Sequence, residues 1–200
     1  GLRICGAGTT PFFGRVGELV ALREALRDAT SANRSRVVLL VGEPGIGKSR
    51  LVLEFARAVD ESPELVTWRQ GRCQPYGERV TFLALGQILK AHAGILDSDE
   101  VPTMESKLEA VLPAGEDRYS LRQRLRPLLG LEATHARREE NFAAWRRFLE
   151  LVGRGGPTVV VLEDLQWADD AMLGFVDGIV SRDLKTPLLV IATTRPELLQ

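Results

Sequence analysis

The chain contains 200 residues, of which 44% are hydrophobic and 26% are charged, a composition typical of globular domains. Its 26 basic and 27 acidic side chains leave no overall positive charge that would attract nucleic acid. No apolar run approaches the roughly 18 residues that a membrane helix needs, and the N-terminus lacks the apolar core of a signal peptide. Two cysteines, Cys5 and Cys73, are too few for a disulfide framework. We therefore predict a cytoplasmic protein, with no contact to a membrane or to nucleic acid through this segment.

Four short runs of β-branched residues and leucine, without polar alternation, predict strands buried on both faces. These runs cover residues 36–41, 65–69, 157–162 and 187–193. The first run leads through a glycine-rich turn into residues 48–59, where Leu51, Phe55 and Val59 recur at helical spacing. Such strands, joined through helices, are typical of a mainly parallel sheet with helices on both sides. The sequence thus predicts an α/β fold.

The stretch between the second and third predicted strands shows helical periodicity interrupted by loops. Pro102 can begin a helix, and residues 140–152 place an apolar stripe on one helix face. Ser120 and Gln123 have the spacing of a capping box, which predicts a helix that begins at Ser120. Because no linker-like composition separates this stretch from the strands, we predict a helical insertion of about residues 78–155 within one domain.

Residues 42–49 read GEPGIGKS and match the phosphate-loop (P-loop) pattern, with Gly42, Gly47, Lys48 and Ser49 at its defining positions. A strand before the loop and a helix after it are the context in which backbone N–H groups bind phosphate. There Lys48 would contact the β- and γ-phosphates, and Ser49 would bind Mg²⁺. We expect nucleotide contacts from Gly42, Glu43, Pro44, Gly45, Ile46, Gly47, Lys48, Ser49 and Arg50. The alternative interpretation is a glycine turn with an exposed lysine.

Two acidic residues follow the third predicted strand. Glu163 and Asp164 end the apolar run TVVVL, at the sheet edge where open α/β sheets bind ligands. One carboxylate would bind Mg²⁺ and the other would orient the attacking water, and their order leaves open which does which. The alternative is a solvated strand-to-helix turn in which Asp169 or Asp170 caps the next helix.

The fourth predicted strand ends in Thr193, Thr194 and Arg195. A cation here can reach a γ-phosphate, so we expect Arg195 to sense it while one of the threonines positions water. The alternative is an arginine that is simply solvated at a strand end. The predicted catalytic residues are therefore Lys48, Glu163, Asp164 and Arg195, and the predicted metal ligands are Ser49, Glu163 and Asp164.

Together these motifs resemble the STAND-type ATPases of the AAA-like P-loop class, as attached to bacterial adenylate cyclases, serine/threonine kinases and LuxR-type regulators. The similarity is carried by residues 11–19, 41–55, 71–77, 159–169 and 188–197. In the resembling family, a segment like the first of these holds adenine and ribose, which implies nucleotide contacts from Phe13, Gly14 and Arg15. The resemblance also implies a P-loop NTPase three-layer sandwich that uses ATP and Mg²⁺.

We expect an ATP-dependent regulatory switch with slow hydrolysis. Residues 1–10 would be a tail or linker, and residues 11–200 the ATPase core, truncated before the family's lid. Its partners would be ATP or ADP and either an effector domain of a longer chain or other subunits of an oligomer. A nucleotide-binding module without hydrolysis and a small-molecule phosphotransferase stay open as alternatives. No Asn-Lys-x-Asp sequence occurs to recognise guanine, which disfavours a GTPase.

Several further residues are assigned to packing or surface. Trp68, Trp145 and Trp167 lie beside apolar runs, which predicts core or rim packing for the three rings. Cys73 is also assigned to packing. The arginine-rich stretch 118–147 is interleaved with acidic residues, so we expect a solvated helix face there rather than a nucleic-acid site.

Overall fold

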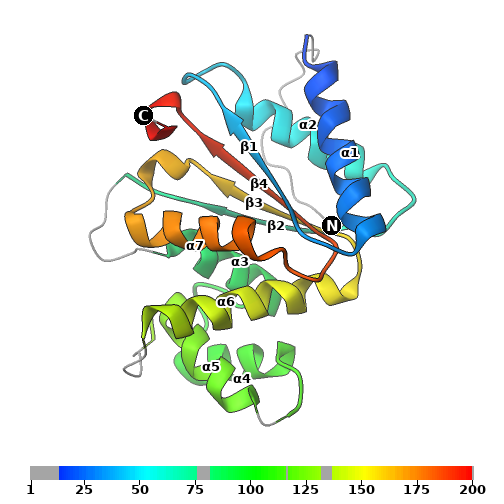
Figure 1. Ribbon diagram of the computed structural model, residues 1–200. Coiled ribbons are helices and arrows are strands. Elements are labelled where there is room, and N and C mark those ends of the chain that lie inside the picture. Colours follow the sequence, from blue (N-terminus) through cyan, green and yellow to red (C-terminus); the bar gives the residue numbers. More distant parts are fainter. Residues whose placement is uncertain (1–13, 76–81, 116, 132–136, 200) are drawn as a thin grey trace.

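The computed structural model describes residues 14–75, 82–115, 117–131 and 137–199 (Figure 1). The strands are β1 (Arg36–Val41), β2 (Thr67–Arg72), β3 (Thr158–Glu163) and β4 (Leu188–Thr194). The helices are α1 (Val16–Ala32), α2 (Lys48–Asp60), α3 (Leu83–Ala93), α4 (Val101–Val111), α5 (Asp117–Leu125), α6 (Arg138–Val152) and α7 (Asp170–Arg182). Short 3₁₀ turns cover Arg126–Leu129, Gly153–Gly155, Leu165–Trp167 and Pro196–Leu199.

The strands form one sheet in the order β1-β4-β3-β2, and each neighbouring pair is parallel. β4 comes last in the chain but lies between β1 and β3, so Val38 stands opposite Ile191 and Val160 opposite Val190. Because parallel strands all end at the same edge, the segments that follow the strands meet there. The predicted α/β fold with a parallel sheet is confirmed.

Two apolar cores cover the two faces of the sheet. Side chains alternate along a strand, so Val159 and Val161 of β3 pack with α1 and α2, whereas Val160 and Leu162 pack with α3, α6 and α7. Every residue of β3 and β4 is buried, as predicted for strands covered on both faces. The same prediction is wrong for β1 and β2, which lie at the two edges of the sheet: no residue of β1 is fully buried, and Leu39 and Val41 are each 42% exposed. Helices on both sides of the sheet form the predicted three-layer sandwich (Figure 1).

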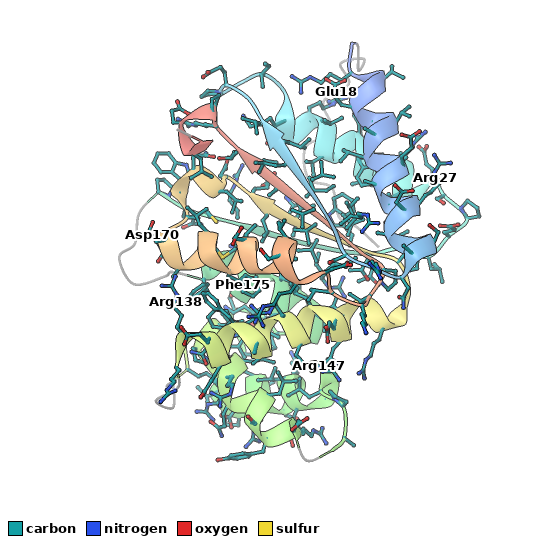
Figure 2. The ribbon with its side chains drawn as sticks, in the orientation of Figure 1. Glu18, Arg27, Arg138, Arg147, Asp170 and Phe175 are labelled. Carbon is teal, nitrogen blue, oxygen red and sulfur yellow. The ribbon has the colours of Figure 1, made fainter. Side chains whose placement is uncertain are left out.

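The predicted helical insertion contains α3, α4, α5 and α6, and its expected start near residue 78 lies outside the described residues. α3 packs directly on β2 because Gly71 has no side chain: a Cβ there would lie 2.0 Å from the Ala84 carbonyl oxygen. Figure 2 shows Phe175 of α7 facing α6, where its ring centroid lies 5.5 Å from that of Phe142 and 5.8 Å from that of Trp145. The insertion therefore shares one apolar core with the sheet.

The predicted bounds of β2 are wrong by two to three residues. The apolar pair Leu65-Val66 favoured a strand over 65–69, yet Leu65 is 94% exposed. The strand covers Thr67–Arg72 because all six of its residues pair with the six residues of β3. The shift matters for the site, since it places Arg72 beside Glu163.

The predicted capping box at Ser120 is wrong as well. α5 already begins at Asp117, so Ser120 lies within the helix, and its side chain is exposed. A capping hydroxyl must precede the first helical turn, and Ser120 does not. The tryptophans follow the packing prediction: Trp68 and Trp145 are buried, and Trp167, which is 44% exposed, lies at the rim.

Candidate functional site

The loop between β1 and α2 has the backbone geometry of an anion-binding cradle. Gly45 and Gly47 have φ values of +78° and +95°, a region that other residues rarely adopt. A Cβ on Gly42 would approach Cγ2 of Ile46 to 2.9 Å, so the closed loop also needs glycine at its start. α2 begins at Lys48 without a side-chain cap. The first N–H groups of the helix therefore remain available to phosphate oxygens.

Lys48 and Ser49 lie at the junction of this loop and α2. The Lys48 Nζ donates hydrogen bonds to the Gly42 carbonyl and, at 3.0 Å, to the Glu43 carbonyl, which holds the ammonium group over the loop. Ser49 is exposed next to it on the first turn of α2. Arg50 points along the same helix instead, where its guanidinium lies 2.7 Å from Glu54 Oε1.

The two predicted acidic residues lie at the end of β3 and share one cation. Glu163 is only 8% exposed, and Asp164 has a left-handed backbone conformation with φ of 60°. The Nε of Arg72 lies 3.3 Å from Glu163 Oε2 and 3.0 Å from Asp164 Oδ2. Gln166 donates a hydrogen bond of 3.2 Å to Asp164 Oδ1. Arg72 was not among the predicted site residues, although it belongs to the segment 71–77 that carries part of the family resemblance.

The end of β4 joins the loop to the acidic residues. The N–H of Gly42 donates to the Thr194 carbonyl at 3.3 Å, and the N–H of Asp164 donates to Thr193 Oγ1 at 3.0 Å. The guanidinium of Arg195 stacks on the ring of Trp167, 5.5 Å from its centroid. Thr193 thus fixes the backbone of an acidic residue, and the predicted phosphate sensor has an aromatic partner that the sequence did not indicate.

The predicted N-terminal contacts are described only in part. Phe13 lies outside the described residues, and Gly14 is exposed with φ of +86°. Arg15 crosses to the P-loop, where its Nη2 donates a hydrogen bond of 2.5 Å to the carbonyl of Ile46. Arg15, which directly precedes α1, therefore contacts the loop, although 31 residues separate the two partners in the chain.

A buried thiol lies beneath the acidic residues. Cys73 donates its backbone N–H to the Glu163 carbonyl at 2.9 Å, and its side chain is buried as predicted. Burial, followed by the negative charges of Asp164 and Asp169, raises the pKa of this thiol to about 11. Asp169 accepts a 2.9 Å hydrogen bond from the N–H of Met172 and so caps α7, which was the alternative weighed for this residue.

Oxygen donors for a hard cation are available at this edge of the sheet. Ser49 offers a hydroxyl, and Glu163 and Asp164 offer carboxylates, the donor types that Mg²⁺ prefers together with phosphate oxygens and water. Within the described ranges, no three histidine, cysteine or acidic side chains cluster as a ready-made metal site. The hydroxyl and carboxylate donors fit a metal that also binds phosphate oxygens and water.

A family model described as the AAA ATPase domain matches residues 11–191, which is most of the chain. The chain belongs to this family. As an AAA ATPase domain it is a nucleotide-binding module of the ATPase type, and its P-loop is the expected nucleotide contact. The match does not distinguish the STAND type from other AAA domains.

An uncharacterized protein of Rhizobium meliloti (strain 1021) is 32% identical to the chain over 210 aligned residues. The alignment covers 92% of this AAA ATPase domain but only 19% of that relative, so the matched segment is a small part of a longer protein there. None of the helices in the described ranges has the length and apolarity of a membrane span.

Proposed function

We propose that this AAA ATPase domain binds ATP with Mg²⁺ and hydrolyses it slowly, as a nucleotide-controlled switch. The observation that carries the proposal is the meeting of three strand ends. The P-loop follows β1, the pair Glu163-Asp164 ends β3, and Thr193 and Thr194 end β4. Two hydrogen bonds connect these ends directly. A phosphate cradle next to carboxylates is the arrangement that phosphoryl transfer to water requires.

Each residue has a definable part in this proposal. Lys48 would bind the β- and γ-phosphates, and Ser49 would hold Mg²⁺ together with one of the two carboxylates. The metal would supply positive charge to the phosphate oxygens. The second carboxylate would orient water, and Arg195 would contact the γ-phosphate. The hydrogen bond from Arg15 to the P-loop supports a role for the N-terminal segment in holding the nucleoside.

Slow turnover is supported by Arg72. Its guanidinium forms ion pairs with both acidic residues, so a carboxylate that acts on water or metal must loosen a charge-assisted contact first. The same contact supports the second candidate function, a module that binds nucleotide without hydrolysing it. The two candidates share a binding site and differ only in whether phosphate is released.

Action within a larger protein is also part of the proposal. The Rhizobium meliloti relative devotes 19% of its length to the matched segment. A domain of this kind would pass its nucleotide state to an effector domain in the same chain or to other subunits. STAND-type regulatory ATPases work in this way according to the resemblance described above.

Calorimetry with ATP, ADP and GTP, with and without Mg²⁺, tests binding. We expect ATP to bind in the presence of Mg²⁺ more tightly than GTP, and Lys48→Ala to weaken that binding about tenfold or more because a charge-assisted phosphate contact is lost. Lys185→Ala is the matched control, since Lys185 is exposed in the loop before β4, at the opposite end of the sheet. Equal affinities of the two variants would overturn the proposed site.

Phosphate release from ATP separates the two candidate functions. For a hydrolase, Glu163→Gln and Asp164→Asn should each lower the rate about 100-fold or more, while ATP remains bound. Equal background release by the wild type and both variants would leave the binding module as the function.

A further inference from the structure

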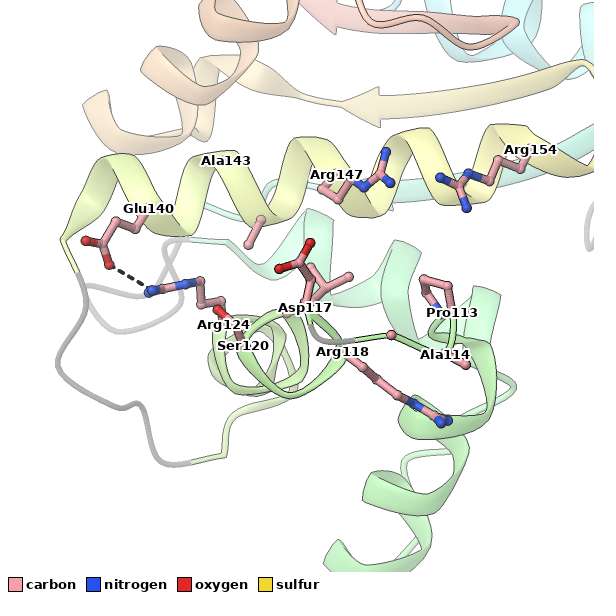
Figure 3. A pocket seen from close by; sticks show the side chains of 13 residues that line it. Pro113, Ala114, Asp117, Arg118, Ser120, Arg124, Glu140, Ala143, Arg147 and Arg154 are labelled. Atoms are coloured by element: carbon pink, nitrogen blue, oxygen red, sulfur yellow. Dashed lines mark ion pairs between the residues drawn. The ribbon is translucent and has the colours of Figure 1, made fainter.

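A cavity lies in the helical insertion, between α5 and α6 (Figure 3). Its volume of about 590 Å³ is within the range of small-molecule sites. The walls come from the loop at residues 113–115, from α5, from α6 and from Arg154 just after α6. No residue of the P-loop or of the acidic pair lines it, so it is separate from the nucleotide site.

The charge of this cavity is positive. Four arginines line it, namely Arg118, Arg124, Arg147 and Arg154, against two carboxylates, those of Asp117 and Glu140. The lining thus carries a net charge of +2, whereas the whole chain has a net charge of -1. A positive cavity on a weakly acidic protein selects for an anionic ligand.

Two of the arginines, Arg147 and Arg154, are well placed to bind such a ligand. Of the other two, Arg124 is paired with Glu140 at 2.9 Å, and Arg118 donates to the carbonyl of Glu109. The Nη1 of Arg147 lies 2.8 Å from Glu150 Oε2, so one side of this guanidinium is already paired. Figure 3 shows the guanidinium groups of Arg147 and Arg154 pointing toward one another along α6. Arg154 has no hydrogen bond or ion pair with the residues that the structure describes. An anion between these two groups would accept hydrogen bonds from both and reduce their repulsion.

Apart from the hydroxyl group of Ser120, the other side chains that line the cavity are apolar. Leu121 and Ala144 form buried wall, Ala143 is exposed on α6 beside them, and Pro113 closes the far side. These side chains offer no hydrogen bonds, so they suit the hydrocarbon part of a ligand. The cavity therefore combines an apolar floor with a cationic rim.

We propose that the insertion binds a small molecule that carries a phosphate or carboxylate group on a compact apolar body. The acidic group lies between Arg147 and Arg154, and the apolar body lies against Leu121, Ala143 and Ala144. This site is independent of ATP binding and would stand even if the proposed hydrolysis failed.

NMR of the full 200-residue chain with ¹³C-labelled alanine methyl groups tests the site, because Ala143 and Ala144 report on the cavity floor. The probes are phenyl phosphate, benzoate and, as a neutral match, benzyl alcohol. We expect saturable shifts of both methyl signals with phenyl phosphate or benzoate, and the better of the two identifies the preferred acidic group. Absence of saturable shifts with both acids, or equal binding of benzyl alcohol, would overturn the proposal.

A double variant tests which arginines bind the acidic group of the ligand. Arg147→Gln with Arg154→Gln should weaken the acid about tenfold or more through loss of two charge-assisted hydrogen bonds. The matched control is Arg23→Gln with Arg27→Gln on α1, which removes the same charge from the opposite side of the molecule (Figure 2). Both arginines of each pair are exposed, so neither variant disturbs the core. Equal weakening by the two pairs would show a general charge effect and contradict the site.

Discussion

The charged residues of the nucleotide-binding edge and those of the helical insertion are organised in opposite ways. At the edge, Arg72 of β2 meets Glu163 and Asp164, which follow it in the chain only after the whole insertion. In the insertion, Arg122 pairs with Glu109 at 3.1 Å across the neighbouring helices α4 and α5. The first set depends on the register of parallel strands, and the second depends on helical spacing. At the nucleotide-binding edge the charges come from distant segments, whereas the charges that support the helix pair come from adjacent ones.

The arginine-rich stretch of the insertion illustrates the local kind of order. Arg118, Arg122 and Arg126 recur every fourth residue and face Glu105 and Glu109, which are themselves four apart on α4. The predicted solvated helix face is wrong in part: Arg118, Arg122 and Arg126 are half-buried in an ionic seam between two helices, and Arg146 is buried. Pairs that stay partly open to solvent contribute little each and are screened by salt.

The largest expected effect comes from a substitution that removes the aromatic contact between α7 and the helical insertion. Phe175→Ala leaves a cavity against Phe142 and Trp145 and should lower the free energy of unfolding by about 3–5 kcal/mol, measured in urea. Phe55→Ala in the opposite core is the matched control and should cost a similar amount, because both rings are fully buried. A separate early transition in the Phe175 variant would show that the insertion unfolds by itself.

The next effect concerns Cys73 beneath the acidic pair. With a pKa raised to about 11, its thiolate at pH 8 should be about 100-fold scarcer than in the unfolded chain, and alkylation correspondingly slow. The folded pKa exceeds the unfolded value of 9.0, so the stability that the neutral thiol contributes is complete below pH 9 and is lost as pH rises through about 11.

Mass spectrometry after iodoacetamide treatment measures this reactivity, in a Cys5→Ser background so that only Cys73 reacts. Asp169→Asn removes one of the two charges that raise the thiol pKa and should speed the reaction slightly. Rapid alkylation of the folded wild type at pH 8 would contradict the burial of this side chain.

Arg72→Gln tests whether the ion pairs between Arg72 and the acidic pair, which the strand register brings together, affect catalysis. We expect kcat for ATP hydrolysis to rise about tenfold while KM for ATP changes less, because the variant frees the acidic pair from its ion pairs and leaves the P-loop unchanged. Arg72→Lys should bring kcat part of the way back to the wild-type value. The control is Arg34→Gln at the opposite end of the sheet, where the Nη1 of Arg34 lies 2.8 Å from Asp183 Oδ2. Loss of this ion pair should leave kcat unchanged. Equal effects of Arg72→Gln and Arg34→Gln would remove Arg72 from the mechanism.

The smallest effect belongs to the ionic seam. Glu109→Gln removes contacts to Arg118 and Arg122 and should cost about 1 kcal/mol or less, and the cost should shrink in high salt. Thermal melts at two salt concentrations measure it. Glu24→Gln, whose partner Arg27 lies 3.7 Å away on exposed α1, should have no measurable effect. A loss that salt does not change would show that the seam acts through packing instead.

Much of the fold could be predicted because its signals are local. Residues buried on both faces of the sheet must be apolar, so β3 and β4 were recognisable within about one residue of their ends, and the edge strand β1 was found through its apolar run although it is not buried on both faces. The bounds of β2 were misplaced because this strand has no continuous apolar run. One face packs on α3 through Gly71, which has no side chain, and the other face ends in the polar residues Gln70 and Arg72. The acidic pair was identified by its place at a strand end, but its partner Arg72 depended on a register that no local pattern encodes.

The sequence by itself determined the phosphate cradle, because glycines at Gly45 and Gly47 are needed for positive φ and a lysine and a serine must follow them. It also determined the parallel sheet, since two-sided burial imposes continuous apolar strands. Only the tertiary structure decided which side chains meet: Arg72 with the acidic pair, and Arg195 with Trp167. The physical reason is that backbone conformation and burial act residue by residue, whereas contacts between charged side chains depend on strand register and helix packing across the whole chain.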